Sequence, residues 1–278
     1  MKIFLTGGTG FIGSNFINYA HSKGIELICL RRNESKPRVK LIKNPKWIEG
    51  TINDNLSKEL SKCDVLVHLA SHSTNVPYDT IENCLEYNLI SSLNFLKQAK
   101  KSGISKFIVA GTGFEFGKSG ERYSKIPHNA PLEPTMTYPA SKAAASIIFY
   151  QWAIESIVKF KYLRIFQVFG EGEDGNRLWP SLKNAALNGL DFPLTKGEQV
   201  RDFINVEDLV KLIYSELNFN DCESGIPIYK NIGLGKAQSI KQFATFWWKK
   251  WKATGKLKFG IVDYRKNEIM RYVPEIKK

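Results

Sequence analysis

The first thirteen residues place a short apolar strand directly before a run of glycines. Residues 2–6 are mostly apolar, β-branched or aromatic, which predicts a buried strand. Gly8, Gly10 and Gly13 follow with the spacing G-x-G-x-x-G, and apolar side chains recur with helical spacing over 14–21. A glycine pattern between a strand and a helix is typical of a dinucleotide-binding turn, in which glycines permit a tight turn and close approach to a pyrophosphate. The pyrophosphate then lies at the helix N-terminus, where free N–H groups favour negative charge.

Strands and helices alternate along the first half of the chain. Apolar runs predict strands at 25–30, 47–50, 64–70 and 106–111, and a helical pattern predicts one long helix over 83–101. This alternation predicts an α/β fold with a parallel, doubly wound sheet. Ligands bind beyond the carboxyl ends of the strands in such sheets, so we expect the glycine turn and the later strand ends to share one rim.

The second predicted strand ends in two arginines. In a dinucleotide fold this strand end meets the adenosine ribose, where an acid binds the 2′-hydroxyl of NAD and an arginine accommodates the 2′-phosphate of NADP. Arg31 and Arg32 stand there, and the first acid that follows is Glu34. One charge-assisted hydrogen bond contributes roughly 1.5–3 kcal/mol, which favours NADPH over NADH by about tenfold or more. The sequence therefore predicts NADP(H) as the preferred cofactor, with NAD(H) as the alternative.

A tyrosine and a lysine four residues apart suggest acid–base chemistry. Tyr138 and Lys142 share one face of a helix at this spacing. A free phenol has a pKa of about 10, and a neighbouring ammonium lowers it. A phenol tuned in this way can give a proton to a carbonyl oxygen while a hydride reaches the carbon. Thr112, which follows the strand at 106–111, is a candidate hydrogen-bond donor to the same oxygen.

Together these features resemble the extended short-chain dehydrogenase/reductases, the NAD-dependent epimerase/dehydratase group. The segments that carry the resemblance occur in the family's order at 6–13, 64–70, 112–117, 138–142, 163–170 and 201–208. The resemblance implies a Rossmann-type doubly wound parallel sheet with a smaller C-terminal substrate-binding lobe. It also implies an NAD(P)-binding domain with the catalytic residues over 1–165, and a lobe over 166–278 that binds mainly substrate and is interleaved with the sheet.

The resemblance further implies the ligand-binding residues. Those expected at the cofactor are Gly7, Gly10, Phe11, Ile12, Gly13, Arg31, Arg32, Ile52, Leu69, Ala70, Ser71, Tyr138, Lys142 and Phe166. Those expected at the substrate are Thr112, Gln167, Arg201 and Arg265. The two arginines suit a diphosphate, because guanidinium groups bind phosphate in a bidentate manner. Thr112, Tyr138 and Lys142 are the implied catalytic residues, with Lys142 also holding the nicotinamide ribose.

Three functions follow as hypotheses. The first is NADPH-dependent reduction of a nucleoside-diphosphate 4-keto-6-deoxysugar, with Tyr138 as proton donor, as in bacterial nucleotide-sugar 4-ketoreductases. The second is NAD-dependent 4-epimerisation of a sugar nucleotide. The third, of another class, is RNA binding by a relative that has lost catalysis, against which the intact Thr112, Tyr138 and Lys142 argue. A dehydratase is disfavoured because Gly113 and Phe114 stand where such enzymes often carry an acid pair.

Composition and charge limit the kinds of partner that we expect this protein to bind. The net charge is +13, but the lysines are spread along the chain without an RNA-binding or zinc-finger motif, so we expect no nucleic-acid partner. No apolar run approaches the ~18 residues of a membrane span, which predicts a cytoplasmic protein without a membrane partner. The resemblance implies a homodimer, for which the helices at 83–101 and 138–154 could supply a four-helix contact. We interpret the aromatic helix at 243–251 as core packing, with dimer or membrane-surface contact as weaker alternatives.

Cysteine and histidine usage predicts no metal site. The four cysteines (Cys29, Cys63, Cys84 and Cys222) show no C-x-x-C spacing, which favours buried free thiols. We also expect no metal site among the four histidines. We interpret His68, inside a predicted strand, as a core residue, and His72, just beyond it, as a residue that could face a site.

Overall fold

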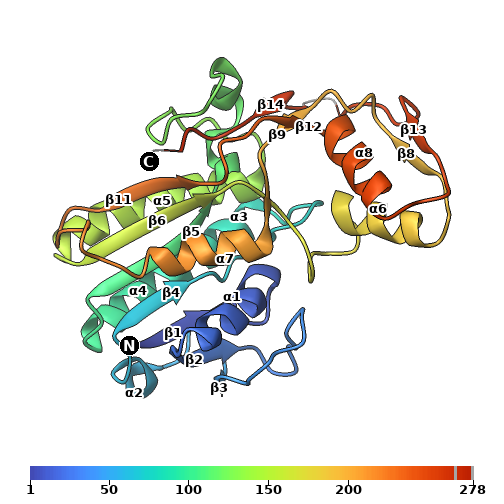
Figure 1. Ribbon diagram of the computed structural model, residues 1–278. Helices are drawn as coiled ribbons and strands as arrows, with labels where there is room; N and C mark the ends of the chain where they lie inside the picture. The colour runs from blue at the N-terminus through green and yellow to red at the C-terminus, as the bar shows by residue number, and fades with distance from the viewer. Residues whose placement is uncertain (266–267, 277–278) are drawn as a thin grey trace.

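A computed structural model gives the structure of residues 1–265 and 268–276. At its centre lies a seven-stranded parallel sheet with the strand order β11-β6-β5-β4-β1-β2-β3 (Figure 1). Its strands are β1 (Lys2–Thr6), β2 (Glu26–Arg31), β3 (Lys46–Glu49), β4 (Val65–His68), β5 (Lys106–Thr112), β6 (Lys159–Ile165) and β11 (Ile228–Ile232). The strand order reverses between β1 and β4, so their carboxyl ends border a crevice of the kind in which such sheets bind ligands. The predicted Rossmann-type sheet is confirmed.

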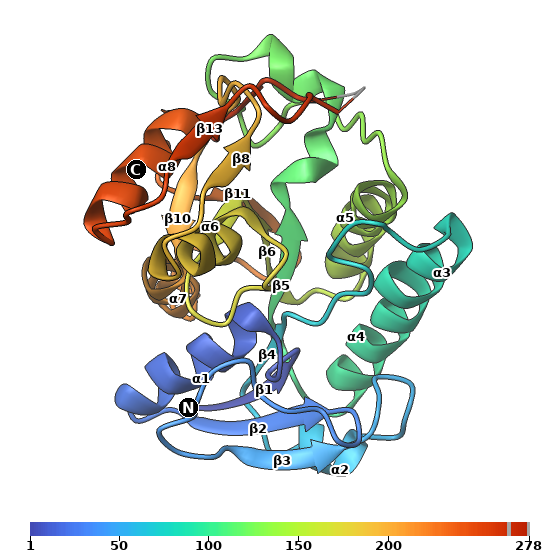
Figure 2. The same cartoon turned by 90° about the vertical axis from the view of Figure 1, so that its right-hand side faces the viewer.

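Helices cover both faces of the sheet, because alternate residues of a strand point to opposite sides. In β1, Ile3 and Leu5 join one buried cluster, whereas Phe4 joins another. The first cluster is covered by α1 and α7 and the second by α4 and α5, on opposite sides of the sheet in Figure 2. These helices are α1 (Phe11–Ser22), α4 (Ser92–Lys101), α5 (Thr137–Glu155) and α7 (Val206–Ser215).

The long helix predicted over 83–101 contains a π-helical turn. Its consecutive parts are α3 (Ile81–Leu85), the π-helical η1 (Glu86–Ser91) and α4. Such turns occur often at functional sites. Here the turn carries the buried Asn88, whose Nδ2 donates to Ser141 Oγ on α5 over 3.0 Å and whose Oδ1 accepts from the backbone N–H of His72 over 2.7 Å. Asn88 therefore ties α5 to the loop that follows β4.

The second half of the sequence builds a smaller lobe beside the sheet, where α6, α8, β8 and β13 lie together (Figures 1 and 2). Its elements are β7 (Gln167–Phe169), α6 (Leu178–Leu187), β8 (Phe192–Leu194), β9 (Val200–Arg201), β10 (Phe203–Asn205), β12 (Gln238–Ser239), α8 (Ile240–Lys250), β13 (Leu257–Phe259) and β14 (Arg271–Tyr272). The chain returns to the main sheet through β11, so lobe and sheet are interleaved. In α8, Phe243 and Trp248 are buried, as the core-packing interpretation expected, whereas Phe246 is 55% exposed.

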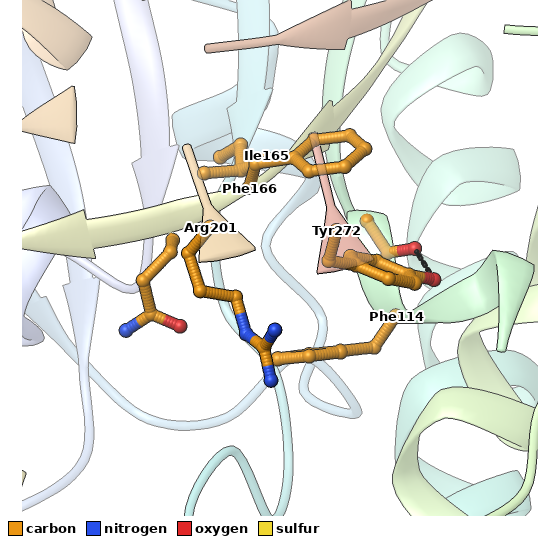
Figure 3. A pocket seen from close by; sticks show the side chains of 7 residues that line it. Phe114, Ile165, Phe166, Arg201 and Tyr272 are labelled. Atoms are coloured by element: carbon orange, nitrogen blue, oxygen red, sulfur yellow. Dashed lines mark hydrogen bonds between the residues drawn. The ribbon is translucent and has the colours of Figure 1, made fainter. Parts of the chain in front are cut away.

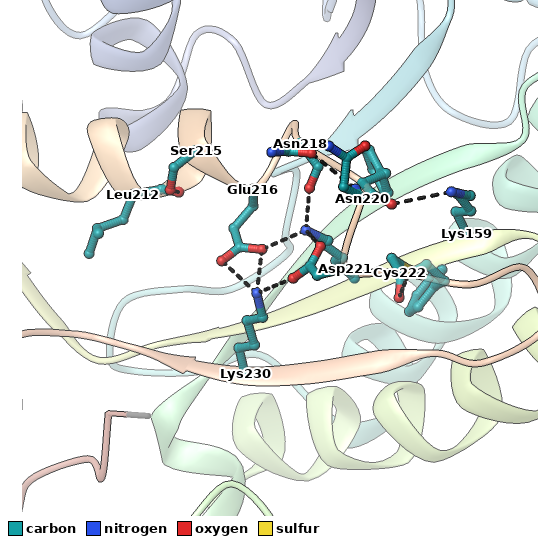
Figure 4. A network of polar contacts seen from close by, with 12 residues as sticks. Lys159, Leu212, Ser215, Glu216, Asn218, Asn220, Asp221, Cys222 and Lys230 are labelled. Carbon is teal, nitrogen blue, oxygen red and sulfur yellow. Dashed lines mark hydrogen bonds and ion pairs between the residues drawn. The ribbon is translucent and has the colours of Figure 1, made fainter. Parts of the chain in front are cut away.

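A polar network holds β11 at the edge of the sheet (Figure 4). Lys161 of β6 is buried, and its Nζ lies 2.9 Å from Glu216 Oε2 and 2.6 Å from Asp221 Oδ1. Lys230 of β11 contacts the same two carboxylates at 2.8 and 2.9 Å. Two ammonium groups and two carboxylates thus compensate one another, which makes the burial of Lys161 tolerable.

Two further predictions concern thiols and membranes. All four cysteines are buried and free, as their spacing predicted. Within residues 1–265 and 268–276, every helix is too short or too polar to cross a bilayer.

Short helical segments complete the fold: α2 (Ser57–Leu60) and the 3₁₀ turns η2 (Gly113–Phe116) and η3 (Lys118–Arg122).

Close backbone contacts require glycine at two positions of the turn, Gly7 and Gly13. Gly7 has φ +74°, and a Cβ there would lie 2.7 Å from the backbone nitrogen of Ala70. A Cβ on Gly13 would lie 2.1 Å from the carbonyl oxygen of Gly7. At Gly8 the closest atom would be the flexible Cδ1 of Ile17, at 3.2 Å. The first essential glycine is therefore Gly7 rather than Gly8, which corrects the G-x-G-x-x-G assignment of the sequence analysis.

This difference can be tested with two matched substitutions. We expect Gly13→Ala to lower the free energy of unfolding by about 2 kcal/mol or more, because backbone must move to admit the methyl group. Gly8→Ala should change it by less than about 1 kcal/mol, because only the end of a side chain must shift. Urea denaturation of both variants measures the difference, and equal destabilisation would contradict the assignment.

Candidate active site

The glycine turn touches the end of β4. The backbone N–H of Leu69 donates to Thr6 O over 3.2 Å, and that of Ala70 donates to Thr6 Oγ1 over 3.3 Å. Because Gly7 lies against the same two residues, backbone from both strand ends forms one continuous surface. Two segments that the sequence assigned to the cofactor are thus in contact.

The start of α1 suits a bound anion. Gly10 is its N-cap and contributes no side-chain cap, and the first turn contains no acid. The N–H groups of this turn therefore have no capping side chain that would compete with a ligand. Phe11 and Ile12 are half-buried and pack on the core below, which fixes the turn. An uncapped helix start beside two obligatory glycines fits a dinucleotide pyrophosphate.

The end of β2 carries an ion pair that the sequence did not reveal. Arg31 Nη2 lies 2.7 Å from Glu49 Oε1, the last residue of β3, while Arg32 is exposed. The parallel pairing of β2 and β3 places these residues side by side, although they are 18 positions apart. Ile52, also expected at the cofactor, is half-buried and packs on the core just after β3.

Tyr138 and Lys142 both lie on α5, as their spacing predicted, and the structure shows that both are buried. The side chains of Ser71, after β4, and Thr112, at the end of β5, lie near the Tyr138 phenol and lower its pKa. The structure therefore brings the three implied catalytic residues and one implied cofactor residue to the same rim.

The protonation states follow from burial. Burial raises the pKa of Tyr138 above its ordinary value, the charge of Glu115 adds to the rise, and the hydrogen bonds from Ser71 and Thr112 oppose it. Burial lowers the pKa of Lys142 to about 8, and its Nζ donates to Ala110 O over 2.7 Å. At neutral pH the phenol is thus protonated and the ammonium mostly charged. Any lowering of the phenol pKa by Lys142, as the resemblance implied, is outweighed by burial in this arrangement.

Glu115 organises this region, and the sequence analysis missed it. Its fully buried carboxylate accepts hydrogen bonds from the backbone N–H of Thr112 (2.8 Å), from Tyr162 Oη (2.9 Å) and from Arg164 Nε (2.8 Å). It also closes a capping box at the start of η2 with Thr112. The T-x-x-E spacing from Thr112 to Glu115 is a sequence signal that could have identified it.

A cleft next to Thr112 gathers three residues that were predicted from the sequence (Figure 3). It is lined by Gly113, Phe114, Ile165, Phe166, Gln167, Arg201 and Tyr272. Arg201 Nη2 donates to Glu268 Oε1 over 2.9 Å. Tyr272 Oη donates to Gly113 O over 2.7 Å and so joins β14 to the end of β5. The sequence analysis missed Tyr272, because nothing local to it indicates that the end of the chain returns to this rim.

Arg265 is exposed and does not line this cleft. Burial raises the pKa of Tyr78, and the charges of Arg177 and Arg265 oppose that rise, so both arginines lie near this phenol. The ring of Tyr78 lies 5.4 Å from that of Tyr138, centroid to centroid. The sequence gave no indication that Arg177 lies here. Its Nε is also 3.7 Å from Glu173 Oε1. Two cations thus lie near an aromatic neighbour of Tyr138.

The two histidines near β4 have separate surroundings. His68 is buried, with Nδ1 2.7 Å from Thr6 Oγ1 and Nε2 3.2 Å from Ser92 Oγ. Burial lowers the pKa of His68 to about 3, so its ring is neutral, as expected of a core residue. His72 Nε2 lies 2.7 Å from Asp79 Oδ2, and a role for it in a site remains a prediction.

A model of the NAD dependent epimerase/dehydratase family matches residues 3–227. The chain belongs to this family. It is 26% identical to CDP-abequose synthase of Salmonella typhimurium over 276 residues, which cover 96% of this chain and 87% of that protein. It is 26% identical to UDP-glucose 4-epimerase of Corynebacterium glutamicum over 262 residues, which cover 87% of this chain and 78% of that protein.

A solved structure of the same architecture is the UDP-N-acetylglucosamine 4-epimerase of Methanobrevibacter ruminantium. It superposes with a TM-score of 0.85 at 24% identity, covering 99% of this chain and 89% of the other, and it supports the fold. Membership of the epimerase/dehydratase family, together with the curated relatives, supports an NAD-dependent enzyme that modifies a sugar nucleotide.

The neutral His68 predicts acid sensitivity. Its folded-state pKa lies below that of the unfolded chain, so the unfolded state binds more protons as the pH falls below about 6.5. Stability from this residue is complete above that pH and is lost as the pH falls toward about 3. We expect the wild-type protein to lose about 2–3 kcal/mol between pH 6.5 and 4.5 that His68→Gln does not lose. Urea unfolding at both pH values measures this, and the same pH dependence in both proteins would contradict it.

Proposed function

We propose that this protein is an NADPH-dependent reductase of a nucleoside-diphosphate 4-keto-6-deoxysugar. The observation that carries the proposal is the buried Tyr138 phenol, whose pKa burial raises, with the side chains of Ser71 and Thr112 near it. Reduction of a ketone requires an acid that gives a proton to the carbonyl oxygen, and a protonated phenol is such an acid.

The side chains have separate roles in this proposal. Thr112 holds the carbonyl oxygen beside Tyr138, which donates its proton to it. Lys142 is close enough in sequence and on the same helix face to stabilise the phenolate that remains, because a nearby ammonium favours the charged phenol. The nicotinamide cofactor supplies the hydride when bound. The residues expected to hold it are the glycine turn, the start of α1 and the segment from Leu69 to Ser71.

We assign substrate binding to the smaller lobe. Gln167 and Arg201 share the cleft beside Thr112, and Arg265 lies near Tyr78 at the neighbouring ring of Tyr138. Arg201 and Arg265 are proposed to bind the diphosphate, for which Arg201 must exchange its contact with Glu268. The similarity to CDP-abequose synthase over nearly the whole chain supports a nucleotide-linked sugar as the substrate.

A second candidate function is NAD-dependent 4-epimerisation. The relatives named UDP-glucose 4-epimerase favour it. So does Glu49, because an acid at the ribose end of a dinucleotide site suits NAD. The epimerase would keep its cofactor bound and return the hydride to the opposite face of the sugar.

The assembly, the compartment and the domain boundary remain predictions. Tyr87 and Ile90 of η1 and Ile147 and Ile154 of α5 are exposed apolar side chains on the two helical segments expected at a dimer contact. They support the expected homodimer. We likewise propose a cytoplasmic location and a division between the two domains at residue 165.

The role of Tyr138 can be tested against a second tyrosine of the same helix. We expect Tyr138→Phe to lower kcat at least about 100-fold, because the proton donor is lost. Cofactor affinity should change by less than about threefold, since the ring remains. Tyr150→Phe is the control, because Tyr150 is 46% exposed on α5. Turnover with 4-keto sugar nucleotides measures the effect, and an active Tyr138→Phe variant would remove the proposed role.

Reductase and epimerase differ in what happens to the cofactor. For the reductase we expect purified protein to release its cofactor, to bind NADPH at least about tenfold tighter than NADH, and to consume NADPH in equal amounts with a 4-keto sugar nucleotide. Absorbance at the nicotinamide band and calorimetric titration at fixed salt measure these quantities. NAD that stays bound through purification, with no net oxidation during turnover, would instead support the epimerase.

A further inference from the structure

The ends of β2 and β3 form a compact ion pair. The register of the two parallel strands sets Arg31 opposite Glu49, and the backbone N–H of Gly50 donates to Arg31 O over 2.9 Å. Arg31 Nη2 lies 2.7 Å from Glu49 Oε1. The backbone on both sides of the pair is therefore held by the sheet, and the two side chains meet at the rim where the strands end.

Trp47 joins this pair to the glycine turn. The guanidinium carbon of Arg31 lies 5.4 Å from the centroid of the Trp47 ring. A Cβ on Gly8 would lie 3.4 Å from Cζ3 of the same ring. One aromatic ring therefore lies between the glycine turn and the guanidinium of Arg31. This arrangement places Arg31 and Glu49 beside the turn, at the strand end that meets the adenosine ribose of a dinucleotide.

The two arginines at this end are not equivalent. The side chain of Arg31 is 29% exposed and that of Glu49 is 55% exposed, so both can meet a ligand. The guanidinium of Arg31 is paired with Glu49 and lies over the ring of Trp47. Arg32 is exposed, and within the described ranges 1–265 and 268–276 it has no ion pair. A cofactor at this strand end would therefore meet Arg32, the guanidinium of Arg31 paired with Glu49, and the carboxylate of Glu49.

We propose that Glu49 sets the selectivity of this site between NADPH and NADH. Its carboxylate occupies Arg31 and repels a 2′-phosphate, and it is placed to accept a hydrogen bond from a 2′-hydroxyl. Recognition of the 2′-phosphate then depends on Arg32. The inference rests on the proposed function only in requiring that a nicotinamide dinucleotide binds at the glycine turn, and it holds for a reductase and for an epimerase.

The test compares the dissociation constants of NADPH and NADH for the cofactor-free full chain, measured by calorimetry at fixed ionic strength. Glu49→Gln keeps the shape and removes the charge. We expect it to raise the ratio Kd(NADH)/Kd(NADPH) about fivefold or more, with a smaller change at high salt. Arg32→Ala should lower that ratio by a similar factor. Arg31→Ala should have a larger effect in the Glu49→Gln background than alone, because only there is the guanidinium released.

The matched control is Glu26→Gln. Glu26 stands at the other end of β2 in an ion pair with Lys2 at 2.8 Å, so its loss tests whether any carboxylate on this strand changes the ratio. An unchanged ratio in Glu49→Gln, with both cofactors still bound, would overturn the inference and leave the proposed function standing. Equal weakening of both cofactors would assign Glu49 a structural role and overturn it too. Failure of the wild-type protein to bind either cofactor would instead refute the proposed function.

Discussion

The contact between the glycine turn and the end of β4 is the constraint on which the rest of the site depends. Backbone approaches backbone here without side chains between them: a Cβ on Gly7 would meet Ala70, and one on Gly13 would meet Gly7. This close approach sets the start of α1 beside the segment after β4. Ser71 can then reach Tyr138 from the one side while the uncapped helix start faces the crevice from the other.

A second constraint comes from the buried carboxylate of Glu115. It joins the backbone of Thr112 to Tyr162 and Arg164, and its charge raises the pKa of Tyr138 while opposing the fall in the pKa of Lys142. A buried charge must be paired and fully hydrogen-bonded to be tolerated, so this network has little freedom to rearrange. The same side chain thus holds Thr112 in place and adds to the rise in the Tyr138 pKa that burial causes.

The two ends of the candidate site, which we propose for the cofactor and for the substrate, depend on contacts of different range. At the substrate end, Arg201 and Tyr272 arrive from short strands late in the chain and meet Phe166, which directly follows β6. At the cofactor end, the pairing of β2 with β3 places an acid beside an arginine. In the proposed function, Arg201 at the first end binds the diphosphate, and the charges of Arg31, Arg32 and Glu49 at the second end set the choice between the two nicotinamide cofactors.

Local patterns in the sequence determined the strands, the glycine turn, the shared helix face of Tyr138 and Lys142, and the core position of His68, because each depends on the spacing of a few neighbouring residues. They did not distinguish Gly7 from Gly8, since that difference comes from contact with a strand some sixty positions away. Glu49 beside Arg31, Arg177 near Tyr78 and Tyr272 in the cleft were decided by the tertiary structure alone. The physical reason is that strand pairing, and the return of later segments of the chain to the same rim, bring together side chains that are far apart in the sequence. No local sequence pattern indicates these contacts.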